Sequence, residues 1–190
     1  LLYGPPGTGK TSIANAVANE LNILFKVINA GENKSMWTGE TIKNINKIFE
    51  SARLFRPILV FIDEIDSIAQ TRSSQEFSNA SDSINTLLAQ LGDTVDNKDI
   101  IFVGATNRKD LIEPALLRPG RFGTHIEVAQ PELPNIKKQL KQQLEEVPHQ
   151  LSETQIDSLA NSLHQQERTQ AEIADYLNNI KRYLLFNTDE

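Results

Sequence analysis

The stretch GPPGTGKT, residues 4–11, sets a lysine and a threonine behind small, flexible residues. It satisfies the pattern G-x-x-x-x-G-K-S/T and lies between a predicted strand and a predicted helix, the context that a phosphate-binding loop requires. Gly7 and Gly9 can take backbone conformations closed to other residues, so consecutive N–H groups can turn toward a phosphate. The following helix adds the positive end of its dipole. The stretch predicts a P-loop; an ordinary glycine-rich turn is the alternative.

Within this motif each polar side chain has an expected partner on a bound nucleotide. Lys10 would reach the β- and γ-phosphates of ATP, and the Thr11 hydroxyl would sit on Mg²⁺. The nucleotide-binding residues expected from the motif are Pro6, Gly7, Thr8, Gly9, Lys10, Thr11 and Ser12.

The second motif is an acidic segment that follows the apolar run ILVFI at residues 58–62. Asp63 and Glu64 come at the carboxyl end of this predicted strand, where open α/β sheets bind ligands, so the element is typical of a Walker B motif. Asp63 would hold Mg²⁺, and Glu64 could deprotonate a water aimed at the γ-phosphate. The alternative is a polar strand exit or a helix cap, and a cap is the role we expect for Asp66.

Two further segments carry polar groups that suit phosphate. Asn107 closes GATN after the fourth predicted strand, where an amide could bond both the γ-phosphate and the attacking water. Arg118 and Arg121 flank a Pro-Gly turn in LLRPGRF, and guanidinium groups suit phosphate recognition. Taken alone, the asparagine is a turn signal, and the arginines fit a solvated turn with surface salt bridges.

The elements that would position these residues alternate between strand and helix patterns, which is typical of βαβ units around a parallel sheet. The sequence predicts an α/β P-loop NTPase fold with a five-stranded parallel sheet flanked by helices. The expected strands span 1–4, 25–30, 57–63, 99–107 and 125–129. Apolar residues recur at helical spacing between the strands, as Ile13, Val17, Leu21 and Leu24 and then as Ile42, Ile45, Phe49 and Ala52.

After residues 130–134 the strand signals stop and three helical patterns follow. LSETQ and ERTQAE supply Ser or Thr caps with Gln or Glu close behind. We therefore expect an α/β domain at 1–131 and a small C-terminal helical lid domain at 132–190. The chain opens mid-strand without an initiator Met, so we expect residue 1 to be a cut edge and the first domain to be truncated at its N-terminus.

Composition narrows the class of protein. With 39% hydrophobic and 23% charged residues, the 190-residue chain has a globular composition, and its net charge of −6 argues against a broad nucleic-acid surface. It has no cysteine, which suits a reducing, cytoplasmic setting, and no run of 18 apolar residues that would indicate a membrane span. His125, His149 and His164 lack companions at metal-ligand spacing, so we expect structural or solvated roles.

In their order along the chain, GPPGTGKT, FIDEID, GATN and LLRPGRF resemble an AAA+ ATPase of the AAA clade. The resemblance covers almost the whole chain and implies an ATP-hydrolysing ring, commonly a hexamer of identical subunits, with each nucleotide between neighbours. By position it implies an ATP–Mg²⁺ site at Lys10, Thr11 and Asp63, a catalytic base at Glu64, a sensor at Asn107, arginine fingers at Arg118 and Arg121, and a lid contact to the nucleotide at Ala171.

The stretch KSMWTGETIKN, residues 34–44, resembles the first pore loop of this clade. In the family the aromatic residue, here Trp37, lines the central channel and grips a polypeptide substrate, a contact that is mainly apolar area. From local composition alone, Trp37 would instead be interpreted as a buried anchor.

Two segments depart from the pattern of the clade. Gly123 and Thr124 stand where an Asp and a basic residue usually follow the fingers, which puts the support of the finger loop in question. Gln170 stands where a lid glycine usually lets adenine approach, which puts the nucleotide contacts of the lid in question.

Three functions fit these motifs. An ATP-driven remodeller or translocase of polypeptides would work through Trp37. A nucleotide-gated assembly or loader module would switch a partner without threading it and would not depend on Trp37. A structural nucleotide-binding protein would bind ATP without hydrolysing it.

Overall fold

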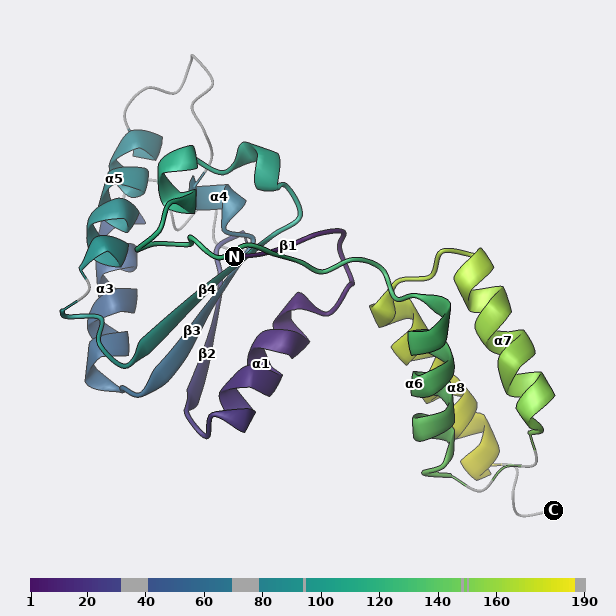
Figure 1. Ribbon diagram of the computed structural model, residues 1–190. Helices are drawn as coiled ribbons and strands as arrows, with labels where there is room; N and C mark the ends of the chain where they lie inside the picture. The colour runs from purple at the N-terminus through teal and green to yellow at the C-terminus, as the bar shows by residue number, and fades with distance from the viewer. Residues whose placement is uncertain (32–40, 70–78, 94, 148, 150, 187–190) are drawn as a thin grey trace. The chain divides into compact units, whose positions relative to one another are not determined.

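In the computed structural model, residues 1–31, 41–69, 79–93, 95–147, 149 and 151–186 are described (Figure 1). The elements follow in the order β1 (Leu2–Tyr3), α1 (Lys10–Glu20), β2 (Leu24–Asn29), α3 (Thr41–Leu54), β3 (Ile58–Asp63), α4 (Asp66–Ala69), α5 (Asn79–Gly92), β4 (Ile100–Thr106), the 3-10 helices η1 (Lys109–Leu111) and η2 (Pro114–Leu117), β5 (Ile126–Glu127), α6 (Leu133–Leu144), α7 (Glu153–Gln165) and α8 (Gln170–Phe186).

The five strands form one sheet in the order β2-β3-β4-β1-β5, and each neighbouring pair runs parallel. The α/β fold with a five-stranded parallel sheet is therefore confirmed. Strand β4, which ends in the GATN segment, lies between β3 and β1. Because parallel strands end at a common edge, the segments after β1, β3 and β4 all leave the sheet on the same side.

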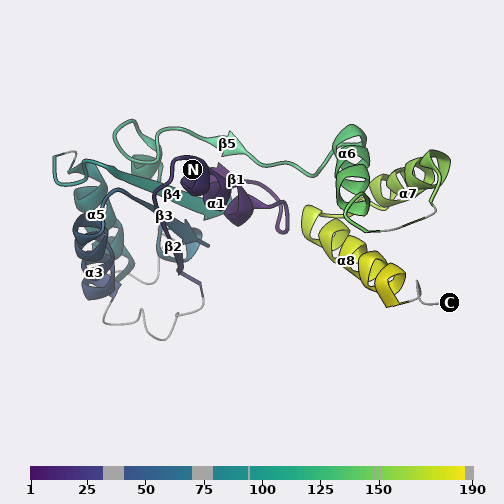
Figure 2. The ribbon, with the colours of Figure 1, turned by 90° about the horizontal axis from the view of Figure 1, so that it is seen from below.

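Strand β3 is buried on both faces, as its unbroken apolar sequence predicts. Ile58, Val60 and Ile62 pack in one core cluster with residues of α3 and α5, whereas Leu59 and Phe61 pack in another with residues of α1. Successive strand side chains point to opposite faces, so this split follows from the strand itself. Helix α1 thus covers one face of the sheet, and α3 and α5 cover the other (Figures 1 and 2).

Helix α1 forms where the apolar periodicity predicts a helix, but its large residues do not make the buried face. Ala14 and Ala18 are 2% and 0% exposed, whereas Ile13 and Val17 are 42% and 43% exposed. Small side chains let the helix approach the sheet closely, and an apolar stripe of larger residues remains on the surface. Leu24, the last residue of the predicted helical pattern, belongs to β2.

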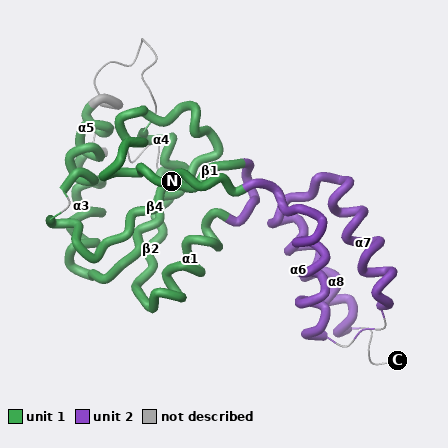
Figure 3. The backbone as a smooth tube through the Cα atoms, in the orientation of Figure 1, with its two compact units in different colours: residues 1–4, 10–128 green, residues 5–9, 129–190 purple. Residues whose placement is uncertain are grey.

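The chain divides into two compact units (Figure 3). The first contains residues 1–4 and 10–128, with the sheet and its helices; the second contains residues 5–9 and 129–190, with α6, α7 and α8. A separate core fills the second unit, around Ile136, Leu140, Leu144, Ile156, Ala160, Leu163, Ile173 and Leu177. The domain boundary between residues 131 and 132 stays a prediction.

Both predicted caps form in the helical unit. The Ser152 side chain accepts from the backbone N–H of Gln155, and the Gln155 side chain accepts from the backbone N–H of Ser152 at 2.8 Å. At α8 the backbone N–H of Thr169 donates to Glu172 Oε2 at 2.8 Å, and the N–H of Glu172 donates back to Thr169 Oγ1 at 3.3 Å. Each capping box satisfies N–H groups that have no partner inside the helix.

Candidate nucleotide-binding site

The loop Pro5–Gly9 has the backbone that a phosphate cradle needs. Gly7 and Gly9 have φ angles of 72° and 93°, a region that side chains other than glycine rarely adopt. Buried Thr8 closes the turn, since its hydroxyl donates to the Pro5 carbonyl at 3.0 Å. Pro6 and Gly7 are exposed.

This loop belongs to the same compact unit as α8. The Gly7 carbonyl accepts from the Ala171 N–H at 2.9 Å in the first turn of α8. A Cβ at Gly7 would come within 3.0 Å of Thr169 Oγ1. Ala171 therefore lies against the loop through its backbone. Thr169, which the sequence predicts as a helix cap, is also a neighbour of the loop.

Lys10 starts α1 and joins two of the predicted motifs. Its Nζ donates to the Gly4 carbonyl at 2.9 Å and to Asn107 Oδ1 at 2.8 Å. Lys10 is only 8% exposed, and this burial lowers the pKa of its ammonium group, while the nearby Asp63 charge raises it. Because Oδ1 of Asn107 accepts from Lys10, the amide N–H groups of Asn107 are available as donors.

Thr11 and Asp63 bring together a hydroxyl and a carboxylate. Thr11 Oγ1 lies 3.4 Å from Asp63 Oδ2, while Asp63 Oδ1 accepts from the backbone N–H of Glu64 at 2.9 Å. Both groups are hard oxygen donors of the kind that Mg²⁺ prefers, and Mg²⁺ usually takes one or two protein ligands and completes its shell with water and phosphate. The pair therefore fits a magnesium ion in chemistry and in number. No cluster of three or more His, Cys, Asp or Glu suited to a metal occurs among the residues that the structure describes.

Glu64 has a backbone conformation that is uncommon for its residue type. Its φ is 50°, and residues held in this region cluster at functional sites. The side chain is exposed and lies against Gly31, so that a Cβ at Gly31 would overlap the Glu64 carboxylate. Gly31 is itself fixed, because its N–H donates to Asn29 Oδ1 at 3.0 Å. This contact between the end of β2 and the predicted base was not predicted from the sequence.

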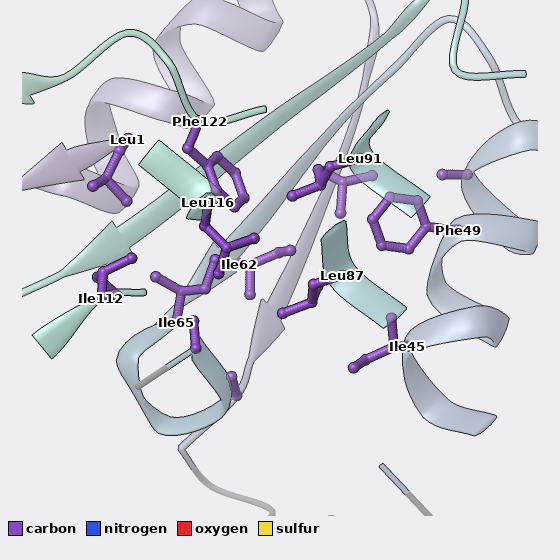
Figure 4. Close-up of a cluster of buried hydrophobic side chains, with 14 of the residues drawn as sticks. Leu1, Ile45, Phe49, Ile62, Ile65, Leu87, Leu91, Ile112, Leu116 and Phe122 are labelled. Atoms are coloured by element: carbon purple, nitrogen blue, oxygen red, sulfur yellow. The ribbon is translucent and has the colours of Figure 1, made fainter. Parts of the chain in front are cut away.

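The arginine loop is anchored at both ends in the core. Leu116 and Phe122, which precede and follow the two arginines, are 0% and 3% exposed (Figure 4), and the Phe122 N–H donates to the Leu116 carbonyl at 3.0 Å. The two arginines differ: Arg118 is exposed, whereas Arg121 donates from its guanidinium to the Ala115 carbonyl at 2.7 Å.

Gly123, one of the residues that depart from the AAA pattern, has a steric role in this loop. A Cβ at Gly123 would lie 2.8 Å from Pro119 Cα and 3.1 Å from the Arg118 carbonyl oxygen. Since both neighbours are backbone atoms, a side chain here would force the loop apart. The glycine thus belongs to a tight turn that holds the arginines.

Other expected residues lie elsewhere. Ser12 is exposed on α1. Trp37 lies outside the described residues, so its place in a pore loop stays a prediction. His149 Nδ1 accepts from the Leu151 N–H at 3.2 Å, a local backbone contact. A hollow of about 370 Å³ lies between α7 and α8, and its lining includes Arg168, Asp175 and Tyr176 but none of the predicted site residues.

Comparison with known proteins decides the family. Residues 1–130 match the family model described as "ATPase family associated with various cellular activities (AAA)". The chain is a member of the AAA ATPase family. The resemblance drawn from its four motifs is confirmed, and the glycine loop, Asp63–Glu64 and Asn107 lie within the matched part of this AAA domain.

Similar proteins carry this AAA domain as a small part of longer chains. "ATPase family gene 2 protein homolog A" of Homo sapiens is 41% identical over 167 residues, which cover 86% of this chain and 19% of the relative. "Cell division cycle protein 48 homolog" of Archaeoglobus fulgidus is 44% identical over 133 residues, which cover 70% of this chain and 18% of the relative. "Peroxisomal ATPase pex6" of Schizosaccharomyces pombe is 49% identical over 127 residues, 64% of this chain and 13% of the relative. The chain thus spans a fifth or less of the length of these relatives.

Within the described part of the chain, no helix is both long and apolar enough to cross a membrane.

Proposed function

We propose that the chain hydrolyses ATP with Mg²⁺ and couples hydrolysis to the remodelling or translocation of a polypeptide in a homo-oligomeric ring. The observation that carries the proposal is the hydrogen bond of 2.8 Å between Lys10 Nζ and Asn107 Oδ1. It joins the P-loop lysine to the residue after β4, while Thr11 lies 3.4 Å from Asp63 at the end of β3. Membership of an ATPase family supports the same reaction.

In the proposed site, each residue has one task on the nucleotide. Lys10 and the backbone N–H groups of residues 7–12 would hold the β- and γ-phosphates, and the two N–H groups of the Asn107 amide would hold a γ-phosphate oxygen and the attacking water. Thr11 and Asp63 would hold Mg²⁺, which supplies charge neutralisation on the phosphate oxygens when bound.

Glu64 is the proposed general base. Its carboxylate would accept a proton as the water oxygen forms a bond to the γ-phosphorus, while the bond from that phosphorus to the β–γ bridging oxygen breaks and leaves ADP and phosphate. The exposed position of Glu64 supports this role, because a base must reach a water in the site.

The proposed ring places Arg118 and Arg121 against the γ-phosphate of a neighbouring subunit and Trp37 in the central channel. Arginine fingers accelerate phosphoryl transfer by about 10³ to 10⁵ in other NTPases. The loader module, which switches a partner without threading it, is the alternative, and it shares every residue of this site except Trp37.

Two substitutions test the reaction and the mode of action. Glu64→Gln should keep ATP binding and lower the hydrolysis rate by roughly a hundredfold or more, measured by phosphate release and by a fluorescent ATP analogue. Unchanged hydrolysis would remove Glu64 as the base.

Trp37→Ala should leave hydrolysis largely intact and abolish unfolding of a fluorescent protein with an unstructured tail, with Trp37→Phe as the aromatic control. Full unfolding activity of Trp37→Ala would support the loader alternative.

A further inference from the structure

We propose that Asp66 and Thr106 are positioning residues that hold the turn presenting Asn107 to the γ-phosphate. The inference deepens the proposed function, because it takes from it the role of Asn107. It rests on a continuous chain of hydrogen bonds from the acidic segment after β3, through the last residue of β4, to the backbone that follows Asn107.

Thr106 is the centre of this chain. Its side chain is 1% exposed, and its hydroxyl donates to Asp66 Oδ1 at 2.6 Å. The same hydroxyl oxygen accepts from the Arg108 backbone N–H at 2.9 Å. A hydroxyl has one proton to donate, and here that proton is used on Asp66 while a lone pair receives the N–H. The short donation to a carboxylate is a charge-assisted bond, stronger than a bond between neutral groups.

Asn107 is held from both sides as a result. The bond from the Arg108 N–H to Thr106 closes the backbone across Asn107, and the Thr106 carbonyl accepts from the Gly4 N–H at 3.3 Å at the start of the P-loop. With the backbone fixed in this way, the Asn107 amide reaches Lys10 Nζ at 2.8 Å. The orientation of the amide therefore depends on the Thr106 hydroxyl.

Asp66 is fixed in turn by its own segment. Ile65, the residue before it, is 0% exposed and donates from its N–H to the Ala105 carbonyl at 3.0 Å. Asp66 begins α4 two residues after Glu64, the proposed base. One short segment thus carries the base and also supports Asn107. The distance between base and sensor is therefore set by bonds between the segment after β3 and the end of β4, and not by either loop alone. The cap role expected for Asp66 gives no reason for this contact with Thr106.

A solely structural role would have different consequences. If the chain of bonds only satisfied a buried hydroxyl, its loss would lower the stability of the fold. Any effect on activity would then be the same with or without the Asn107 amide. A positioning role acts through Asn107, so its effect must disappear when the Asn107 amide is removed. Non-additivity of two substitutions measures this dependence.

The test compares Thr106→Val and Asp66→Ala, which break the chain of bonds, with Thr106→Ser and Asp66→Asn, which keep a hydroxyl and an Oδ1 acceptor. The breaking variants should lower kcat for ATP by roughly ten- to a hundredfold, as small misplacements in an active site do. KM should be nearly unchanged, because Lys10 keeps its bond to the Gly4 carbonyl and the loop is unaltered. The conservative variants should retain most of kcat. In an Asn107→Ala background, Thr106→Val should cause no further loss of kcat.

Amide hydrogen exchange at Arg108 reads the bond directly and needs no turnover. We expect exchange to be faster in Thr106→Val than in the parent and in Thr106→Ser. Unchanged exchange in Thr106→Val, or a Thr106→Val effect on kcat that adds in full to Asn107→Ala, would overturn the inference. If Asn107→Ala itself kept full kcat, the proposed sensor role would fail, and the positioning role would fail with it; faster exchange at Arg108 would show that the bonds exist without that role.

Discussion

The side chains of the candidate site are held in place by contacts of a few atoms each. Lys10 is held by the Gly4 carbonyl and the Asn107 amide, and Asp63 is held by the Glu64 N–H. The Glu64 carboxylate occupies the space that a Cβ at Gly31 would fill. At this scale a change of one carbon atom can move a reacting group without disturbing the fold, and Gly31 offers the clearest case.

Gly31→Ala should displace the Glu64 carboxylate and lower ATP hydrolysis, by roughly tenfold or more if the base moves by about 1 Å. The cost in stability should be small, because the far end of Glu64 can swing away from the added methyl group. Phosphate release and the thermal midpoint would be measured on the same samples. Gly92→Ala is the matched control, since a Cβ there meets nothing within 4 Å. Equal hydrolysis by the two variants would contradict the positioning of Glu64 by Gly31.

Local motifs explain why part of the site is predictable from sequence. Lys10, Thr11, Asp63 and Glu64 follow from short patterns at strand ends, and the structure brings Lys10 to Asn107 and Thr11 to Asp63 as those patterns require. The contact of Gly31 with Glu64 and the bond of Asp66 to Thr106 join residues far apart in sequence. They depend on which strands are neighbours, and no local pattern carries that information.

At the scale of elements, the loop before α1 and the start of α8 are coupled within one unit. The Thr169 cap of α8 faces the place where Gly7 lacks a side chain, and the Ala171 N–H bonds the Gly7 carbonyl. Bonds from the Thr169 N–H and from Arg168 also hold the pKa of the Glu172 carboxyl in this capping box below its usual value. Thr169, which caps α8, thus also borders the loop at Gly7.

Two capping substitutions separate helix stability from nucleotide binding. Ser152→Ala in α7 and Thr169→Ala in α8 each remove a cap and should each cost about 1 kcal/mol of unfolding free energy in urea. Thr169→Ala should in addition weaken ATP affinity severalfold, because Thr169 also borders the loop at Gly7, whereas Ser152 lies at the other helix. Thr169→Ser should restore both properties. An equal ATP affinity for the two alanine variants would contradict a role of Thr169 in nucleotide binding.

The arginine loop is the other segment whose geometry depends on a glycine. The AAA pattern usually has Asp at position 123, and this chain can have Gly there because the turn brings the Pro119 backbone within 2.8 Å of where a Cβ would be. Gly123→Asp should therefore destabilise the loop, with a cost of about 1–3 kcal/mol as in other overpacked sites, and should lower the hydrolysis rate while ATP affinity is kept. Thr124→Asp, which adds the same charge at an exposed neighbour, should affect neither. A Gly123→Asp variant with the thermal midpoint and rate of the parent would contradict the tight turn.

The sequence predicts helix α1 but does not show which of its faces is buried. Ile13 and Val17 belong to the periodic pattern that predicts the helix, yet Ala14 and Ala18 are the residues that pack with the core side chains of the sheet. Hydrophobic periodicity shows where large apolar residues recur along the chain. Which face of the helix packs on the sheet depends on how much room there is between the two, and here only small side chains fit. The anchors Leu116 and Phe122 of the arginine loop escape notice in the same way, because their burial depends on the core that α3 and α5 complete.

At the scale of the whole molecule, the two arginines are not equivalent. Arg121 is engaged with the Ala115 carbonyl of its own chain, whereas Arg118 is exposed. If each active site is completed by a neighbour, the exposed Arg118 can reach it directly, whereas Arg121 would first have to release the Ala115 carbonyl. Hydrolysis would then rise with protein concentration as subunits assemble.

Mixing two inactive variants tests this completion between subunits. A Glu64→Gln subunit lacks the base but offers an intact Arg118, and an Arg118→Ala subunit has the base but lacks the arginine for its neighbour. Each variant alone should hydrolyse ATP more slowly than the parent, by a factor of up to about 10³. Their mixture should regain part of the parent rate, because some interfaces pair an intact Glu64 with an intact Arg118. The matched control mixes Arg118→Ala with the double variant Glu64→Gln, Arg118→Ala, which contains no such interface and should stay slow. A mixture of the two single variants no faster than this control would mean that Arg118 acts within its own chain or not at all.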